Sequence, residues 1–366
     1  MEEALALARQ GLGRTSPNPA VGAIIVSNAV RDGEIVGRGF HTWAGVKHAE
    51  ILALEEAEAG ERARGADLYV TLEPCSHHGR TPPCADAIIA AGISRVVVAM
   101  SDPNPLVSGE GIRRLEAAGI PVEIAFEHTA DAEQLNEAFA FAMRSGRPLV
   151  TLKSAVTLDG KIAAPEDNSG WITSEQARAH VQQVRHLHDA ILTGIGTVLG
   201  DDPLLTDRTH TDRARPLLRI VADSTLRIPL DSRMVMSAAN DLLVATTSAS
   251  SPERRRQLES RGVRVLVADG PGGRTDLRQV VDYLAKEQYR SLMIEAGSKV
   301  NWAALEAGVV DKIFFYYAPK ILGGMQSLPV VGGAGRKHRK DAILFRDVRL
   351  HQVTKEEFAV EAWVVK

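Results

Sequence analysis

The sequence predicts an α/β protein built from two domains. Its 366 residues exceed the usual size of one domain, and a hydrophobic fraction of 45% supplies enough apolar side chains for two cores. Short apolar runs alternate with helical patterns along both halves of the chain, which is typical of layered α/β sheets. The run Ser145-Gly146-Arg147-Pro148 interrupts this alternation, because Gly and Pro end helices. We therefore expect one domain over residues 1–146 and another over 147–366.

The first domain alternates strands with helices from its start. Short apolar runs predict strands over residues 20–26, 68–72, 96–100 and 122–125. Helical spacing of the apolar residues predicts helices over residues 2–10, 49–59, 85–91, 111–118 and 132–144. Gly92 is the expected C-terminal cap of the helix over 85–91.

The second domain repeats this alternation without repeating the sequence of the first. Strands are predicted over residues 149–156, 190–193, 217–222, 242–245, 263–267, 292–295 and 313–317. Helices are predicted over residues 175–187, 252–261, 276–286 and 300–307. The Gly- and Arg-rich segments over 270–274 and 332–340 are expected to be exposed loops, and the basic run 336–340 a solvated surface.

Composition argues against two classes of partner. A formal net charge of -3 is unlike a nucleic-acid-binding surface, which is normally basic. Apolar runs such as 20–26 and 96–100 are too short to cross a bilayer, so we expect no membrane contact. There is no signal-peptide pattern and cysteine is scarce, which together predict a cytoplasmic protein.

The two cysteines of the chain indicate a zinc site. Cys75 and Cys84 follow His48-Ala49-Glu50, and a catalytic zinc takes three protein ligands and leaves one position open. His48, Cys75 and Cys84 are the expected ligands, and Glu50 is the carboxylate left over for proton transfer. Cys84 opens a predicted helix, whose dipole and free amides should favour a thiolate there. Zinc deaminases carry His-x-Glu followed by Pro-Cys-x-x-Cys, although eight residues separate the cysteines here.

Two other interpretations of the cysteines stay open. Cys75 and Cys84 could form a disulfide, although a reducing cytosol disfavours it. Zinc could instead be structural, with His77 or His78 as the fourth ligand. A structural zinc would leave Glu50 without a role.

The motifs of the first domain resemble those of the RibD family of riboflavin biosynthesis. The resemblance rests on Thr15-Ser16-Pro17-Asn18-Pro19, on the long cysteine segment 71–84 and on Asp102-Pro103-Asn104-Pro105-Leu106-Val107. It implies a three-layer fold like that of cytidine deaminases and zinc-dependent deamination of a pyrimidine. It also implies that Asn18 contacts the base and that His77 and Arg80 bind the ring or the phosphate. Otherwise Asn18 is a turn residue, and His77 and Arg80 only solvate their loop.

The second domain lacks the Gly-x-Gly-x-x-Gly fingerprint of a standard Rossmann site. Its segments 153–163, 169–173, 194–208 and 295–298 instead resemble the reductase half of the RibD family. That resemblance implies a fold similar to dihydrofolate reductase and NADPH as the hydride donor. The residues that match family cofactor contacts are Ala155, Trp171, Thr197, Asp201, Ser224, Gly297 and Ser298. Those that match substrate contacts are Ser169, Arg185, Leu205, Arg208 and Glu295.

Elementary chemistry agrees with several of these assignments. The amides of Gly297 and Ser298 precede a predicted helix and suit a pyrophosphate. Arg185 and Arg208 can each bind a phosphate with two guanidinium N–H groups, and we expect the guanidinium of Arg185 to project outward into a cleft. Otherwise Trp171 is a core residue, Asp201 belongs to a turn and the arginines are surface charges.

The resemblance over the whole chain implies a bifunctional enzyme. It would deaminate 2,5-diamino-6-(5-phosphoribosylamino)pyrimidin-4(3H)-one and then reduce the ribosyl chain to ribityl with NADPH, giving 5-amino-6-(5-phosphoribitylamino)uracil. The expected partner is therefore a small phosphorylated pyrimidine, and we expect a homo-oligomer, a dimer or a tetramer. The alternatives are a nucleoside or nucleic-acid deaminase fused to an unrelated domain, and a non-catalytic module with a structural zinc.

Overall fold

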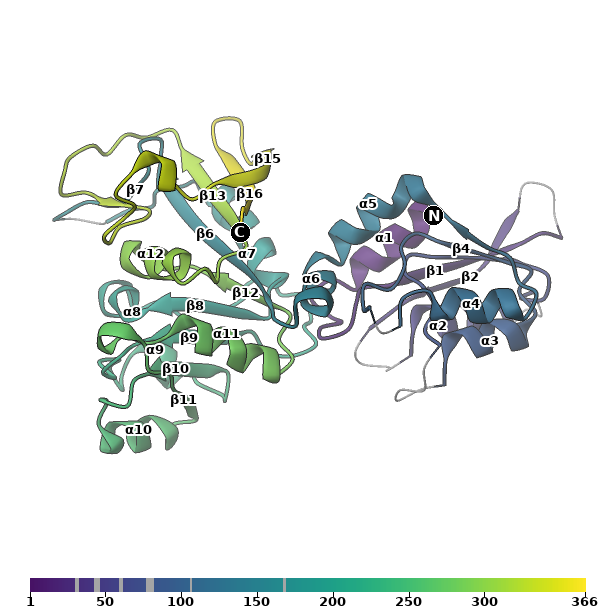
Figure 1. The fold of residues 1–366 in the computed structure, drawn as a ribbon, viewed down its shortest axis with the longest axis horizontal. Coiled ribbons are helices and arrows are strands. Elements are labelled where there is room, and N and C mark those ends of the chain that lie inside the picture. The colour runs from purple at the N-terminus through teal and green to yellow at the C-terminus, as the bar shows by residue number, and fades with distance from the viewer. Residues whose placement is uncertain (30–32, 43–46, 59–61, 77–81, 106, 167–168) are drawn as a thin grey trace. The chain divides into compact units, whose positions relative to one another are not determined.

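The computed structural model describes residues 1–29, 33–42, 47–58, 62–76, 82–105, 107–166 and 169–366 (Figure 1). The chain divides into two compact units. The first unit comprises Met1–Gly146 and Asp212–Arg215, and the second comprises Arg147–Thr211 and Pro216–Lys366. The short segment 212–215 belongs to the first unit because Ala214 N donates to Gly13 O at 3.2 Å and Arg14 lies 3.7 Å from Asp212.

A five-stranded sheet forms the middle layer of the first unit, in the order β2-β1-β3-β4-β5. Strand β1 (Gly22–Ser27) pairs antiparallel with β2 (Glu34–Phe40) on one side and with β3 (Asp67–Val70), the central strand, on the other. Beyond β3, the strands β4 (Arg95–Val98) and β5 (Val122–Ile124) pair in parallel. Four of the five strands coincide with predicted ranges, and β2 is the one that was not predicted.

Helices cover both faces of this sheet (Figure 1). One face carries α1 (Glu2–Gln10) and α5 (Phe126–Leu135). The other carries α2 (Ala49–Glu58), α3 (Cys84–Ala91) and α4 (Glu110–Ala117). This arrangement confirms the three-layer fold predicted for the first half.

Two glycines of β2 let α2 approach the sheet backbone to backbone. A Cβ added at Gly39 would lie 2.1 Å from the Ala49 carbonyl oxygen, and one added at Gly37 would lie 2.1 Å from that of Ala53. Any side chain at these positions would push the helix away. The close approach therefore sets the position of the first turn of α2, which carries Glu50.

The single helix predicted over 132–144 is wrong, because the structure breaks it at Asn136. Helix α5 ends at Leu135 and α6 (Glu137–Ser145) begins after the break. The buried side chain of Asn136 accepts a hydrogen bond from Ala20 N at 2.8 Å and donates one to Ala20 O at 2.9 Å. These bonds to a distant segment hold Asn136 at φ -107°, outside helical geometry.

The second unit is built on a nine-stranded sheet in the order β11-β10-β9-β8-β12-β6-β13-β16-β15. Its first seven strands in that order run parallel, and β16 and β15 add an antiparallel edge. The parallel strands are β6 (Leu149–Thr157), β8 (Ala190–Gly194), β9 (Leu218–Ala222), β10 (Leu242–Thr246), β11 (Val263–Val267), β12 (Ser291–Ile294) and β13 (Lys312–Ala318). All seven correspond to predicted strands.

Helices pack on both faces of the large sheet. One apolar cluster joins the sheet to α11 (Leu277–Lys286) and α12 (Ser298–Glu306). Clusters on the other side include residues of α7 (Glu175–His186), α8 (Ile195–Asp201), α9 (Arg233–Met236) and α10 (Pro252–Glu259).

Several short or edge elements of the second unit were not predicted. They are α8, α9, β7 (Lys161–Ala163), β14 (Leu328–Pro329), β15 (Phe345–Gln352), β16 (Phe358–Val364) and the 3-10 turns Pro271–Gly273 and Arg339–Asp341. The basic run 336–340 is exposed, as expected. Within the described residues, no helix combines the length and apolar character needed to span a membrane.

Candidate active sites

Three side chains from separate segments meet in the first unit. His48 directly precedes α2, Cys75 lies beyond the end of β3, and Cys84 is the first residue of α3. Their ligand atoms all lie within 4.8 Å of one another, with His48 Nδ1 3.1 Å from Cys84 Sγ and 3.6 Å from Cys75 Sγ. One imidazole nitrogen and two sulfurs so close together fit a tetrahedral zinc. Both cysteines are free, so the structure does not contain the disulfide.

The two thiols of this group differ in their pKa values. The pKa of Cys75 falls to about 4 because the Cys84 thiol donates to it, with further support from His48 and from the Cys84 amide at 3.3 Å. The pKa of Cys84 is raised, because its thiol is used as a donor to Cys75 and is buried. The first amide of α3, that of Cys84, donates to the Cys75 sulfur.

Glu50 lies in the first turn of α2, beside the candidate metal ligands His48, Cys75 and Cys84. Its side chain is buried, with 4% of the residue exposed. Burial raises the pKa of Glu50 to about 7, because desolvation disfavours the carboxylate. A carboxyl group that titrates near neutral pH can both accept and return a proton.

Asn18 reaches this site through a histidine that sequence reasoning missed. Asn18 Nδ2 lies 3.3 Å from His41 Nε2, and Nδ1 of His41 lies 2.8 Å from the Lys47 carbonyl oxygen. The His41 ring also stands edge-on to His48, with ring centroids 5.4 Å apart. The sequence carried no signal for His41 beyond its place shortly before His48. The predicted contacts His77 and Arg80 lie outside the described residues.

In the second unit two buried cations, Lys153 and Arg185, meet a half-buried carboxylate, Glu295. Glu295, just after β12, lies 2.9 Å from Lys153 Nζ and 2.9 Å from Arg185 Nη2. Burial alone would raise the pKa of Glu295, but the charges of Lys153 and Arg185 outweigh it and lower the pKa to about 2. Lys153 was not predicted as a site residue, because its pairing with Glu295 depends on β6 and β12 being neighbours in the sheet.

Arg185 does not project outward as expected. It is 4% exposed, and it donates to the Thr206 carbonyl oxygen at 2.7 Å as well as to Glu295. Its Nε has no hydrogen-bond partner among the described residues. Arg208, by contrast, is exposed, and Leu205 is buried at φ +50°. The predicted Ser169 is exposed.

The predicted cofactor residues follow the carboxyl ends of neighbouring parallel strands, where open α/β sheets bind ligands. Thr197 and Asp201 lie in α8 after β8, Ser224 follows β9, and Gly297 and Ser298 follow β12. Ala155 lies near the carboxyl end of β6, between β12 and β13.

The start of α12 has the character of an anion site. Gly297 caps the helix without a side-chain hydrogen bond, and a Cβ added there would meet nothing within 4 Å. The buried Ser298 Oγ has no partner within the described part of the chain. Free amides and a free hydroxyl at a helix N-terminus fit the phosphates of a dinucleotide.

Two other predicted cofactor residues, Trp171 and Ser224, contact neighbouring residues of the second unit. Trp171 is 69% exposed, so it is not a core residue, and the guanidinium of Arg178 lies 4.6 Å from its ring centroid. The Ser224 hydroxyl accepts from Thr275 N at 3.0 Å.

Comparison with known proteins identifies the family. The cytidine and deoxycytidylate deaminase zinc-binding region matches residues 1–100, and the RibD C-terminal domain matches residues 148–359. Riboflavin biosynthesis protein RibD of Escherichia coli (strain K12) is 45% identical over 344 residues, which cover 90% of each chain. That of Actinobacillus pleuropneumoniae is 44% identical over 344 residues, covering 94% of this chain and 89% of that protein. The chain belongs to the RibD family.

Solved RibD structures share the whole fold. Acinetobacter baumannii RibD is 36% identical, with a TM-score of 0.86 over 100% of this chain and 98% of that one. A diaminohydroxyphosphoribosylaminopyrimidine deaminase/5-amino-6-(5-phosphoribosylamino)uracil reductase from Thermotoga maritima is 35% identical, with a TM-score of 0.83 over 100% of this chain and 97% of that one.

Membership of the RibD family confirms the central predictions. The chain is a bifunctional deaminase and reductase of riboflavin biosynthesis, and its cofactors are zinc and NADPH. Neither alternative, an unrelated fusion or a non-catalytic module, is supported.

Proposed function

We propose that residues 1–146 deaminate 2,5-diamino-6-(5-phosphoribosylamino)pyrimidin-4(3H)-one and that residues 147–366 reduce the product to 5-amino-6-(5-phosphoribitylamino)uracil. The observation that carries the first assignment is the burial of Glu50 beside His48, Cys75 and Cys84. The name of the Thermotoga maritima neighbour supports this substrate and this order of reactions.

The deamination needs a nucleophile and a proton carrier. Zinc held by His48, Cys75 and Cys84 would lower the pKa of a water molecule so that water can attack the ring. Glu50 would carry the two protons of that water in turn, the first to the ring nitrogen and the second to the amino group that leaves as ammonia. Its pKa of about 7 suits both transfers. Asn18, held by His41, would contact the base, and His77 and Arg80 would bind the ring or the phosphate.

The reduction needs a bound cofactor and an oriented substrate. NADPH supplies the hydride. Its phosphates would meet the amides of Gly297 and Ser298, and its remaining contacts would be Ala155, Trp171, Thr197, Asp201 and Ser224. The substrate would contact Ser169, Arg185, Leu205, Arg208 and Glu295. Lys153, whose buried Nζ donates to Glu295 Oε1 at 2.9 Å, would supply the proton that the reduction consumes.

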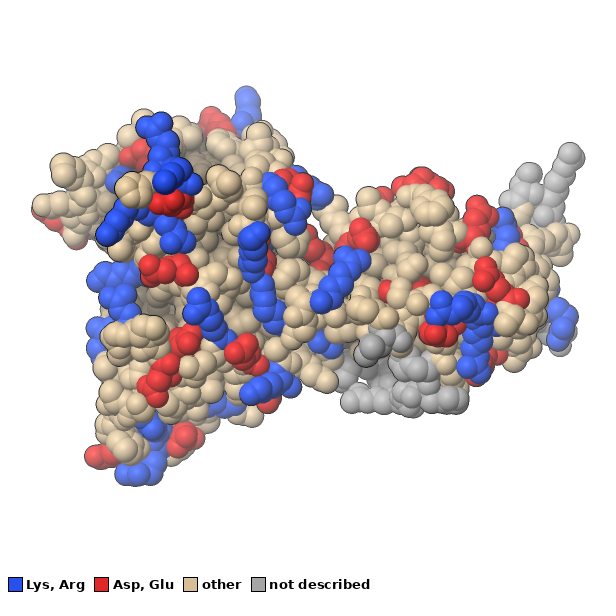
Figure 2. Space-filling model, viewed as in Figure 1, with Lys and Arg blue, Asp and Glu red and all other residues tan. Residues whose placement is uncertain are grey.

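We also propose a cytoplasmic homo-oligomer that does not bind nucleic acid. Thiolate ligands need a reducing compartment. Basic and acidic side chains are interspersed on the face drawn in Figure 2, which does not suit a polyanion. Strand β15 is exposed at the edge of its sheet and carries exposed Val348 and Leu350, which suits pairing with another copy. We propose a dimer or a tetramer.

Glu50→Gln tests the assignment of both activities. The variant should keep its zinc and release no ammonia, because an amide cannot carry the proton. It should still oxidise NADPH when given the deaminated intermediate directly. Glu55→Gln is the matched control, because Glu55 is an exposed carboxylate on the same helix. Substantial ammonia release by Glu50→Gln would refute the assignment of Glu50 as the base. Loss of reduction in the folded variant would refute the assignment of the two activities to separate domains that meet between residues 146 and 147.

A further inference from the structure

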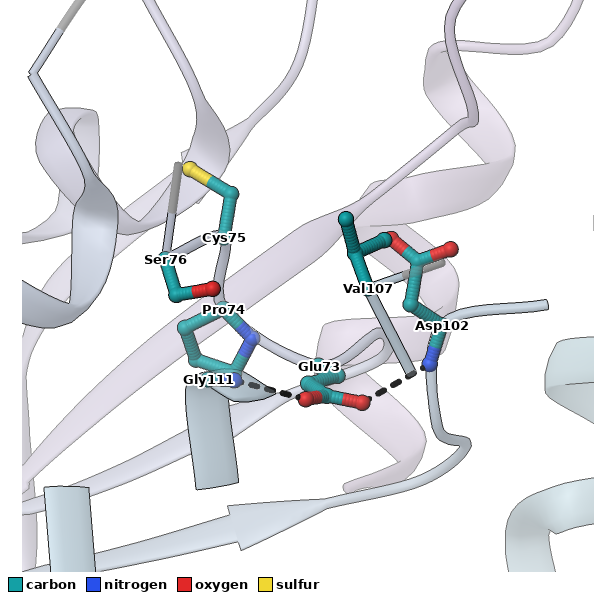
Figure 3. Close-up of a pocket in the computed structure, with 7 residues that line it drawn as sticks. All are labelled: Glu73, Pro74, Cys75, Ser76, Asp102, Val107 and Gly111. Atoms are coloured by element: carbon teal, nitrogen blue, oxygen red, sulfur yellow. Dashed lines mark hydrogen bonds between the residues drawn. The ribbon is translucent and has the colours of Figure 1, made fainter. Parts of the chain in front are cut away.

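Glu73 is a buried carboxylate that the reaction does not use. It lies between the end of β3 and the metal-ligand residue Cys75, and only 5% of it is exposed. Figure 3 shows its side chain pointing toward the backbone of Asp102 and Gly111, whereas the Cys75 sulfur points the other way. Glu73 is therefore not placed to be a metal ligand.

Both oxygens of Glu73 accept backbone N–H groups from a distant segment. Oε2 accepts from Asp102 N at 3.0 Å and from Gly109 N at 2.9 Å. Oε1 accepts from Gly111 N at 2.9 Å and from Ile112 N at 3.3 Å. These donors begin the loop after β4 and open helix α4, so one side chain connects two sequence motifs.

The carboxylate caps α4 in place of a local residue. The N-cap of this helix is Gly109, which has no side chain to accept a hydrogen bond. The first amides of a helix need an acceptor, and a negative charge there also interacts favourably with the helix dipole. Glu73 meets both requirements and thereby fixes α4 against the strand that leads to Cys75.

Helix α4 directly contacts Pro74, the residue before Cys75. A Cβ added at Gly111 would lie 1.9 Å from the Pro74 carbonyl oxygen, so α4 and Pro74 touch backbone to backbone. On the other side, the Cys75 carbonyl oxygen accepts from Ala85 N at 3.1 Å, in the first turn of α3. Cys75 is thus held between α4, through Glu73 and Pro74, and α3, which carries Cys84.

We propose that Glu73 is the positioning residue that sets the place of Cys75 in the zinc site. It acts through the backbone of Pro74 and the N-terminus of α4, without touching the metal. This inference rests on the proposed role of Cys75 as a zinc ligand. A parent protein without zinc would refute that role, whereas a change confined to Glu73 variants tests the inference itself.

Glu73→Gln is the sharpest perturbation, because it keeps the size of the side chain. All four contacts of the carboxylate are N–H donors, so the new amide NH2 group must face two of them whichever way it turns. The variant therefore loses one of the two pairs of bonds, either to 102 and 109 or to 111 and 112.

Asp67→Asn is the matched control. Asp67 is a buried carboxylate at the start of β3, the strand that leads to Glu73, and it accepts hydrogen bonds from Asn28, Ser94 and Arg95. Its hydrogen bonds stabilise the end of β3 that is remote from Cys75. Loss of stability without an effect on the metal is the expected result of this substitution.

The experiment measures zinc affinity by chelator competition and the visible absorption of the cobalt-substituted full-length protein. Glu73→Gln should weaken zinc binding by about 10- to 100-fold, as for other residues that orient a metal ligand, and should alter the cobalt spectrum. Asp67→Asn should leave both unchanged, and NADPH oxidation by the second unit should persist in both variants. Parental zinc affinity and a parental cobalt spectrum in folded Glu73→Gln protein would overturn the proposal.

Glu73→Asp is a second variant for the same measurements, to be used if Glu73→Gln does not fold. It keeps the charge but shortens the side chain by one methylene group, so the carboxylate cannot reach both ends of the loop. We expect an intermediate zinc affinity and an intermediate spectrum. A folded Asp variant with the parental values of both would overturn the proposal equally.

Discussion

Arg185 Nη2 lies 2.9 Å from Glu295 Oε2, and this ion pair links α7 to the end of β12. Arg185 Nη1 also donates a hydrogen bond to the Thr206 carbonyl oxygen at 2.7 Å. One guanidinium therefore connects a helix, a strand end and the loop that carries Arg208. A residue predicted only as a substrate contact also has a structural role.

Arg185→Ala should lower the free energy of unfolding of the second unit by about 2–3 kcal/mol. Removing one partner of a buried ion pair leaves the other charge uncompensated, although Lys153 still neutralises part of Glu295. Urea unfolding followed by circular dichroism measures this change. Arg208→Ala is the control and should change stability by less than about 0.5 kcal/mol, because Arg208 is exposed. Equal effects of the two substitutions would contradict the buried pair.

The destabilisation by Arg185→Ala should shrink in acid. The pKa of Glu295 is lowered from 4.5 to about 2 in the folded protein, so the carboxylate contributes stability above pH 4.5 that is lost as the pH falls toward 2. Without Arg185 the folded pKa returns part of the way toward 4.5, because Lys153 stays beside the carboxylate, and part of this contribution is therefore missing at pH 7. At pH 3 the difference between parent and variant should be roughly half its value at pH 7. A difference that does not vary with pH would mean that packing, rather than charge, is lost.

Arg208→Ala should raise the apparent KM for the phosphorylated intermediate of the reduction. Loss of a charge-assisted hydrogen bond weakens binding by about 10- to 100-fold. The KM for NADPH should stay nearly constant, which steady-state kinetics with each substrate varied in turn will reveal. If NADPH binding weakens and intermediate binding does not, Arg208 belongs to the cofactor site.

Replacing Cys75 and Cys84 together with Ser should remove zinc and ammonia release. Two of three ligands are lost, and a serine hydroxyl is a poor substitute for a thiolate. Elemental analysis should find one zinc per parent chain and none in the double variant, while reduction of the deaminated intermediate continues. Stoichiometric zinc in the double variant would mean that other residues bind the metal.

The sequence by itself determined the fold class and pointed to the residues of the candidate metal site. A Cys2His zinc site needs rare residue types, and His48 and Cys84 directly precede helices that the sequence pattern already predicts. The same local patterns located all seven parallel strands of the second unit, because buried parallel strands are continuous apolar runs. The exposed edge strand β15 lacked such a run and was missed.

Only the tertiary structure decided which side chains support those sites. Each of three such side chains contacts a residue far away in the sequence. His41 contacts a residue 23 positions away, Glu73 accepts from residues 29 to 39 positions away, and Lys153 donates to a residue 142 positions away. The break at Asn136 and the burial of Arg185 have the same origin, because bonds to Ala20 and to Glu295 override what the local helical pattern predicts. The local spacing of residues in the sequence indicates secondary structure and possible metal ligands. The pairing of buried polar groups depends instead on which strands and helices become neighbours in the fold.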